Sequence, residues 1–246
     1  SLNVGAYSVV VVDANGCQAK SETGIITQPN PLEVSLEIEQ DITCFGEEDG
    51  QLFANATGGN GTYTYNLTGP SGTVTQVENP LFIGLEPGNY TVEVVDVKGC
   101  TALSFPVDFE APAQLEVGEI LMDSVSCNGD ADGRLEITAF GGTPPYTYSL
   151  DDTIYQDTNV FEGLDGGVYQ VFIKDSNDCV SLPFEQLVYE PGVLFIAGQV
   201  EQHISCSGEV EGHLRASISG GTPPFEFFLN QDSIWQSDPN FYNLPA

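Results

Sequence analysis

Basic side chains are scarce in this sequence of 246 residues, which has 5 Lys and Arg against 36 Asp and Glu and a formal net charge of −31. So acidic a surface repels phosphate groups, which argues against nucleic-acid binding and against anionic membrane surfaces. The carboxylates are scattered along the chain and do not form one acidic tail. They suit a solvated surface in a secreted or saline setting, with a calcium-loaded surface as the alternative.

Catalytic groupings are missing as well. The chain has 2 His, and it contains no Ser-His-Asp set, Gly-rich phosphate loop or CxxC pair. We therefore expect no enzyme active site and no cofactor here, calcium apart.

There is no initiator Met, signal peptide, transmembrane run or amphipathic helix pattern. Because the chain starts and stops inside a repeated pattern, we interpret it as an internal fragment of a longer chain, so the missing targeting segment says nothing.

What the sequence does have is a repeat. Cys17, Cys100 and Cys179 lie 83 and 79 positions apart. Three other sets keep the same two offsets: Cys44, Cys127 and Cys206; Gly58-Gly59, Gly141-Gly142 and Gly220-Gly221; Pro29, Pro112 and Pro191. A period of about 80 residues is too long for a solenoid and suits a small independent β-domain. We predict two whole repeats, 31–112 and 113–191, flanked by the end of one repeat (1–30) and the front of another (192–246).

A strand with a Gly-x-Tyr start is the centre of each repeat, at residues 5–13, 88–96 and 167–175. Apolar residues alternate along it with period two, and it ends in Asp followed by a turn and a Cys, which is typical of a half-buried β-strand. About seven short strands per repeat, with turns of Gly, Pro, Asn and Asp, predict an all-β fold of tandem immunoglobulin-like β-sandwiches. The Tyr resembles the tyrosine corner of such sandwiches, in which the phenol caps backbone at a strand entry.

The cysteines follow the repeat, with one before the Gly-Gly strand and one after the Gly-x-Tyr strand. We predict disulfides Cys44–Cys100 and Cys127–Cys179, each joining loops at one end of a sandwich, while Cys17 and Cys206 have partners outside these residues. One disulfide per small domain indicates an oxidising compartment and hence an exported protein, the alternative being reduced cytosolic thiols.

These patterns together resemble the SprB repeat, named for a giant gliding-motility adhesin of Bacteroidetes. The matching motifs are SCNGDADG (126–133), GGTPPYTYSL (141–150), F-x-G-L-x-x-G-x-Y-x-V-x-V-x-D, and the Asp-x-x-x-Cys ending. The first whole repeat departs from them, with Gly-Asn-Gly-Thr-Tyr at 59–63 and a longer hairpin. The resemblance implies a cell-surface or secreted bacterial protein, exported by the type IX system, whose repeats serve as a stalk or as adhesive units. It carries no catalytic residues to transfer.

An acidic pair follows the first Cys of each repeat, in the pattern Cys-x-Gly-acid-x-acid-Gly. The candidate calcium ligands are Glu47 and Asp49, Asp130 and Asp132, and Glu209 and Glu211. Two carboxylates at i and i+2 can chelate a hard cation if the same end of the sandwich adds a further carboxylate, such as Asp96 or Asp175, or carbonyl oxygens. The alternative is an acidic hairpin turn, because Asp-Gly is a common turn pair.

The variable hairpins carry the remaining candidates. Tyr155 and Trp235 occupy matched positions, where an exposed ring could stack on a sugar, although such rings are more often core. Asp-Ser or Asp-Thr followed by Ile or Val resembles the Bacteroidetes O-glycosylation pattern and implies glycans on Ser124, Thr153 and Ser233.

The function we predict is mechanical: a semi-rigid stalk of a large secreted cell-surface adhesin. Short Pro-containing linkers stiffen it, and weak adhesion to surface polysaccharide is multiplied by repeat number. The expected partners are neighbouring repeats and surface glycans, without nucleic acid and without membrane insertion. Two alternatives are a spacer in an exported hydrolase and a carbohydrate-binding accessory region.

Overall fold

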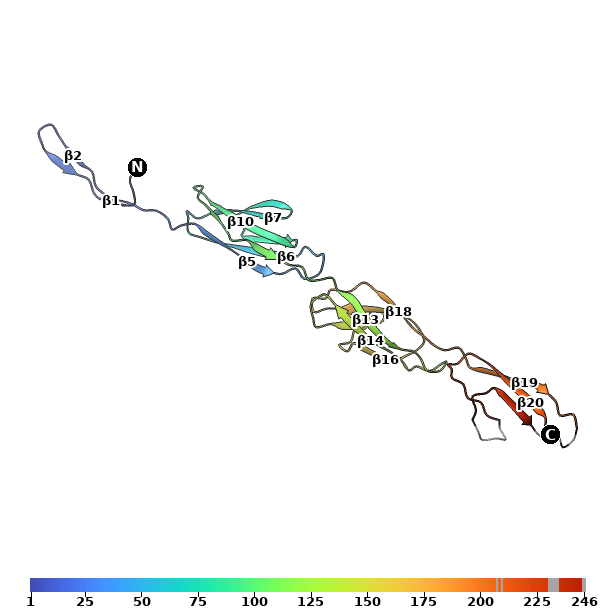
Figure 1. Cartoon of the computed structure of the whole chain (residues 1–246). Coiled ribbons are helices and arrows are strands. Elements are labelled where there is room, and N and C mark those ends of the chain that lie inside the picture. The colour runs from blue at the N-terminus through green and yellow to red at the C-terminus, as the bar shows by residue number, and fades with distance from the viewer. Residues whose placement is uncertain (207, 209, 230–234, 245–246) are drawn as a thin grey trace. The chain divides into compact units, whose positions relative to one another are not determined.

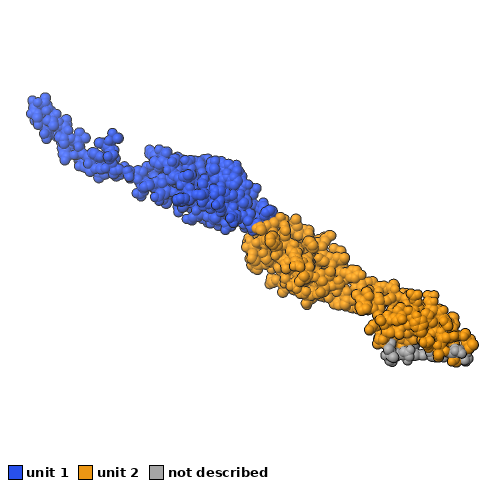
Figure 2. All heavy atoms as spheres, in the orientation of Figure 1, with its two compact units in different colours: residues 1–112 blue, residues 113–246 orange. Residues whose placement is uncertain are grey.

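The computed structural model describes residues 1–206, 208, 210–229 and 235–244 (Figure 1). Its regular elements are β-strands, and no helix of this described part is long and apolar enough to cross a membrane. The chain divides into two compact units, Ser1–Pro112 and Ala113–Ala246 (Figure 2). Each unit holds one whole repeat and one partial repeat.

The first whole repeat, 31–112, is a sandwich of two antiparallel sheets. One sheet has the order β5-β6-β9, and the other has the order β11-β10-β7-β8, with β12 also paired to β10. The strands are β5 (Glu33–Gln40), β6 (Gly50–Thr57), β7 (Tyr63–Gly69), β8 (Gly72–Val77), β9 (Leu81–Leu85), β10 (Gly88–Asp96), β11 (Thr101–Leu103) and β12 (Val107–Phe109). The first, second and fifth strands of the repeat form one sheet, and its remaining strands form the other. This is the strand order of an immunoglobulin-like sandwich, so the predicted fold is confirmed.

The alternating residues of the two sheets form its core. Val92 and Val94 of β10 and Leu52 of β6 are completely buried, and Leu67 of β7 is 2% exposed. Tyr90 packs edge-on against Phe109, with 5.8 Å between ring centroids. Period-two alternation in the sequence therefore reports correctly which side chains lie between the sheets.

The second whole repeat, 113–191, repeats this plan with a shorter hairpin. Its sheets are β13-β14-β16 and β15-β17-β18. Instead of a paired strand after β15, residues 151–158 form a loop closed by the bridge between Tyr148 and Gln156. The strands are β13 (Glu116–Asp123), β14 (Gly133–Phe140), β15 (Thr147–Ser149), β16 (Val160–Leu164), β17 (Gly167–Lys174) and β18 (Phe184–Val188).

The partial repeats each show one part of the sandwich. Residues 1–30 form the two pairs β1-β4 and β2-β3, and residues 192–244 form the sheet β19-β20-β21. Many of their apolar side chains are exposed, with Val9 at 71% and Phe195 at 63%, whereas Ala216 and Phe227 are each 8% exposed. The strands are β1 (Gly5–Tyr7), β2 (Val10–Val12), β3 (Gln18–Lys20), β4 (Gly24–Ile26), β19 (Phe195–Gln202), β20 (Gly212–Ser219) and β21 (Asn240–Leu244).

The predicted tyrosine corner is present in three repeats. The phenol of Tyr90 donates a hydrogen bond to the carbonyl oxygen of Glu86 (2.9 Å). Tyr169 donates to Asp165 (3.0 Å) and Tyr7 to Asn3 (2.9 Å). In each case the acceptor lies four residues upstream, so the Tyr pins the chain where it enters the Gly-x-Tyr strand.

Each whole repeat is entered at one end of its sandwich and left at the other. In the first, Glu33 at the start of β5 pairs with Thr57, while Phe109 in the last strand pairs with Gly88 at the opposite end. We call these the entry end and the exit end. The same register holds in the second, where Glu116 pairs with Phe140 and Val188 with Gly167.

Candidate functional site: the ends of the repeats

The Gly-Gly turn at the entry end holds the incoming linker. Gly141 has a φ of +73°, and a Cβ there would lie 1.9 Å from the carbonyl oxygen of Gln114. The next amide, of Gly142, donates to the carbonyl of Ala113 (2.8 Å). Only glycine combines this positive φ with so close an approach. The equivalent Gly58 and Gly220 have the same clash, at 1.9 and 2.0 Å, which explains why the pair recurs.

The Asp that ends the Gly-x-Tyr strand ties this turn to the loop that carries the second Cys. One oxygen of Asp96 accepts from the amides of Lys98 and Cys100 (2.8 and 3.0 Å), and the other accepts from the amide and side chain of Asn60 (2.9 and 2.7 Å). Burial opposes ionisation, but the bonds to Asn60, Cys100 and Lys98 hold the pKa of Asp96 well below its usual range. The carboxylate therefore fixes the position of the second Cys at the entry end.

Asp175 repeats this arrangement in the second whole repeat. It accepts from the amides of Asn177 and Cys179 with one oxygen (2.8 and 3.0 Å) and from the amide of Thr143 with the other (2.8 Å). Thr143 of the Gly-Gly-Thr-Pro-Pro form thus replaces Asn60 of the Gly-Gly-Asn-Gly form. The first whole repeat therefore keeps these hydrogen bonds to its Asp, although the backbone of its turn differs from that of the second, with positive φ at Gly61 and Thr62.

The acidic pair lies at the exit end, where its second carboxylate orders the loop around the first Cys. Asp49 accepts from the amide and hydroxyl of Thr43 (3.1 and 2.6 Å), directly before Cys44, and Thr43 holds the pKa of Asp49 below its usual value. Asp132 accepts from the amide of Ser126 (2.9 Å). The hydrogen bond from Ser126 lowers the pKa of Asp132.

The same loop recurs before Cys206, where Glu211 accepts from the amide of Ser205 (2.8 Å) and its pKa is lowered by Ser205. Of the first acids, Asp130 lies 3.4 Å from the hydroxyl of Ser126, Glu47 is exposed, and Glu209 lies outside the described residues. The Ser or Thr before each Cys was missed from the sequence, although its recurrence six residues ahead of the second acid was a usable signal.

The calcium prediction finds no assembled ligand set. In the part of the chain that the structure describes, no group of three or more His, Cys, Asp and Glu side chains could hold a metal ion. Asp96 and Asp175, suggested as third ligands, lie at the entry ends of their repeats, opposite the acidic pairs of the same repeat. That suggestion was wrong, because the whole length of β6 or β14 separates the acidic pair from the Gly-Gly turn beside which Asp96 or Asp175 lies. Binding by the acidic pairs themselves stays a prediction.

The linker after the second whole repeat is held by the repeats on both sides. The carboxylate of Glu190 accepts from the amide of Gly129 (2.7 Å) and the side chain of Asn128 (3.1 Å), and Asn128 also donates to the carbonyl of Pro191 (3.1 Å). From the other side, Gly221 of the next Gly-Gly turn donates to the carbonyl of Gly192 (2.7 Å). Neighbouring residues of one short linker are therefore fixed to the exit loop of one repeat and to the entry turn of the next.

The predicted disulfides within single repeats are wrong. Cys100 and Cys127 are free, exposed thiols, as are Cys17 and Cys206, whereas Cys44 and Cys179 are disulfide-bonded. The physical reason is distance: Cys44 lies at the exit end of its repeat and Cys100 at the entry end. One strand of eight residues already separates such ends by roughly 25 Å, whereas a disulfide requires Cα atoms within about 7 Å.

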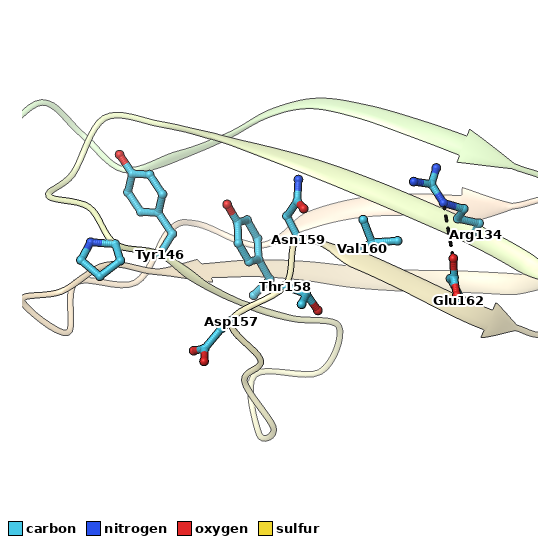
Figure 3. A pocket seen from close by; sticks show the side chains of 9 residues that line it. Arg134, Tyr146, Asp157, Thr158, Asn159, Val160 and Glu162 are labelled. Carbon is cyan, nitrogen blue, oxygen red and sulfur yellow. Dashed lines mark ion pairs between the residues drawn. The ribbon is translucent and has the colours of Figure 1, made fainter.

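A groove runs along the side of the second whole repeat (Figure 3). It is lined by Arg134 of β14, Tyr146 and Tyr148, and residues 157–160 and 162. Arg134 forms ion pairs with Glu136 (2.5 Å) and Glu162 (3.9 Å). Tyr146 donates to the carbonyl of Gly141 (2.8 Å) and Asn159 to that of Ile137 (2.9 Å). These polar groups hold the repeat together, and the groove offers few of them to a ligand.

The two matched aromatics of the variable hairpins differ in their surroundings. Tyr155 is half-buried, donates to Asp152 (2.5 Å), and lies under the ammonium of Lys174, 4.5 Å from the ring centroid. Trp235 is 60% exposed and packs against Phe228 with 4.5 Å between ring centroids. Sugar binding at either position stays a prediction, and the exposed ring of Trp235 suits it better than the partly covered ring of Tyr155.

The predicted glycosylation residues are accessible where they are described. Ser124 and Thr153 are exposed, and Ser233 lies outside the described residues. The amide of Thr153 donates to Asp151 (2.9 Å), and Thr153 lowers the pKa of Asp151 to about 2. Glycosylation at these positions stays a prediction.

Solved structures similar to this chain are distant. A C-terminal 282-residue fragment of intimin, crystallised with the intimin-binding domain of the translocated intimin receptor, shares 12% identity at a TM-score of 0.36, covering 65% of each chain. A tetra-tandem repeat from the extending region of a large adhesion protein shares 12% identity at 0.30, covering 97% of this chain and 72% of that one. The FN1–FN3 domains of chicken CNTN1 share 12% identity at 0.23, covering 89% and 90%.

The chain thus spans just under two thirds of the intimin fragment. With every TM-score below 0.5, these likenesses support no inference about function. Comparison with curated proteins found no match.

The family comparison is more specific. The SprB repeat model matches residues 37–72 and 122–153. The first segment runs from β5 through the exit-end Cys loop and the Gly-Gly turn to the hairpin after β7, and the second covers the corresponding strands and loops of the next repeat. Each of the two whole repeats therefore contains a segment that matches the SprB repeat model.

Proposed function

We propose that this chain is a segment of the stalk of a large bacterial cell-surface adhesin, exported to the outside of the cell, which extends and spaces a functional tip. One observation carries the proposal: each repeat is entered at one end and left at the other. Every added repeat therefore adds its strand length to the reach of the chain. The SprB repeat segments support the surface location, and their adhesin namesake supports the adhesive role.

The linker at residues 190–192, which is hydrogen-bonded on both sides, favours a stiff stalk and not a flexible string of domains. Glu190 and Gly192, two positions apart, are bound by different repeats, so little free chain remains between them. A linker of this kind acts as a spacer. Weak adhesion to surface polysaccharide by individual repeats would then be multiplied by their number.

Small-angle scattering of the whole chain tests the extended arrangement. Strands of eight or nine residues span roughly 28 Å, so three repeats in series, with their loops, reach about 120 Å. A thin rod of this length has a radius of gyration of about 35 Å. A compact globule of this length has a radius of gyration of roughly 18 Å. We expect the larger value. A compact value would contradict the stalk.

Matched variants test the linker. Asn128→Ala should broaden the distribution of interatomic distances, because it removes the side chain that holds Glu190 and Pro191. Glu185→Ala, an exposed position on β18 of the same repeat, serves as the control and should leave the scattering unchanged. Equal curves for both variants and the parent chain would show that the clamp does not stiffen the junction.

A further inference from the structure

We propose that β8, the last strand of its sheet in the first whole repeat, is a docking edge for a second copy of this chain. The β8 strands of the two copies pair antiparallel and join their sheets side by side. Such a pair has two-fold symmetry, so each copy offers the same surface to the other. The inference goes beyond the proposed function, because a stalk extends and spaces its tip whether or not it pairs with another stalk.

The outer edge of β8 is open. β8 (Gly72–Val77) stands at the end of the order β11-β10-β7-β8, and in the part of the chain that the structure describes it pairs with β7 alone. This pairing runs from Gly69 opposite Gly72 to Thr64 opposite Val77 without a register shift. In an antiparallel pair, alternate residues direct both their N–H and C=O groups away from the partner strand. β8 therefore offers a continuous row of backbone donors and acceptors to an added strand.

The other edge strands of this repeat carry features that prevent edge-to-edge pairing, which are short length, charge and bulges. β11 and β12 have three residues each. β9 has a register shift in its pairing with β6, and β5 carries three Glu as well as a register shift. β8 has six residues, of which none is charged or Pro and five are exposed. It is therefore the edge of this repeat best suited to the addition of a strand.

A long neutral stretch of sequence contains β8. Residues 50–77 include no Asp, Glu, Lys or Arg, although 17% of the chain is charged and its net charge is −31. Two copies repel each other where their acidic surfaces meet, and they repel each other least where a neutral hairpin meets a neutral hairpin. A basic partner would instead be attracted to the acidic surfaces. The charge pattern therefore favours an identical strand as the partner of β8.

The second whole repeat has a different structure at this position. Residues 151–158, all of them described, contain three Asp and form a loop closed by a single bridge, not a paired strand. The carboxylate of Asp151 accepts from the amides of Thr153 and Ile154 (2.9 and 3.2 Å), so the acidic side chain organises the loop. Pairing of this kind is therefore a property of the first whole repeat.

Apolar side chains next to β8 give an added strand something to cover. A cleft of about 160 Å³ between β8 and β9 is lined by Val74 and Ile83 at its rim and by Leu67, Phe82 and Tyr90 of the core. Val74 lies opposite Leu67, so both point to the core side of the sheet. Val74 is 53% exposed and Ile83 is 65% exposed. A strand beyond β8 places its own core-side residues over this cleft, which adds apolar burial to the backbone hydrogen bonds.

Sedimentation equilibrium of the whole chain tests the proposal. The exposed thiols are first blocked by alkylation without reduction, so that they cannot cross-link two copies. We expect the mass to rise from 26.3 kDa toward twice that value between about 10 μM and about 1 mM, the range of small interfaces. The association should be tighter in about 1 M salt than in about 0.1 M salt, because salt screens the repulsion between the two acidic chains.

Hydrogen exchange locates the contact. Amides in residues 72–77 should exchange more slowly as the concentration rises, whereas those of the loop 151–158 should not change. A monomer at every concentration, a dimer without added protection in β8, or an association that weakens with salt would each overturn the proposal.

Matched variants separate the edge from general charge effects. Val74→Lys and Val77→Lys each place a charge on β8 and should weaken the association at least about tenfold, although each makes the chain less acidic. Leu103→Lys makes the same charge change at a side chain that is 70% exposed on β11, the opposite edge of the same sheet, and should not weaken it. Thermal melts by circular dichroism confirm that the variants fold. If both β8 variants dimerise as the parent chain does, or if Leu103→Lys weakens the dimer as much as they do, the proposal is wrong.

Discussion

Four predictions concern single repeats and their ions. Tyr90→Phe should lower the free energy of unfolding by about 1 kcal/mol in urea titrations, because the hydrogen bond of the phenol to the carbonyl of Glu86 is lost. An unchanged urea midpoint would show that the tyrosine corner does not stabilise the repeat. Gly141→Ala should destabilise its repeat by at least about 1–2 kcal/mol, since it adds left-handed strain and a clash with Gln114, whereas Gly167→Ala, which has open space, should not. Asp49 has a lowered pKa in the folded chain, so its stabilising effect is complete above about pH 4 to 5 and is lost as the pH falls below that range. Asp49→Asn should flatten this acid transition, and an unaltered transition would contradict the assignment. Millimolar calcium at matched ionic strength should leave the melting curve in EDTA unchanged, because this carboxylate already accepts hydrogen bonds; a saturable rise lost in Asp49→Asn would instead establish a metal site.

The sequence predicts the repeats and the strands well because both depend on local patterns. Alternation along residues 88–96 identifies Val92 and Val94 as core, and the Tyr90 corner follows from its place at the strand start. Tertiary placement was harder to predict. Nothing local indicates that Asp96 accepts hydrogen bonds from Asn60, which lies 36 positions earlier, or that Tyr155 is partly covered by Lys174.

The prediction of disulfides within single repeats was wrong, and counting the strands between the two cysteines of a repeat would have been sufficient to reject it. Two cysteines that recur once per repeat fit bonds within repeats and bonds between repeats equally well, so spacing alone cannot choose. The number of strands between them can choose, because each antiparallel strand carries the chain from one end of the sandwich to the other. Five strands, β6 to β10, separate Cys44 from Cys100. An odd number puts the two cysteines of the first whole repeat at opposite ends of its sandwich, where they cannot bond to each other.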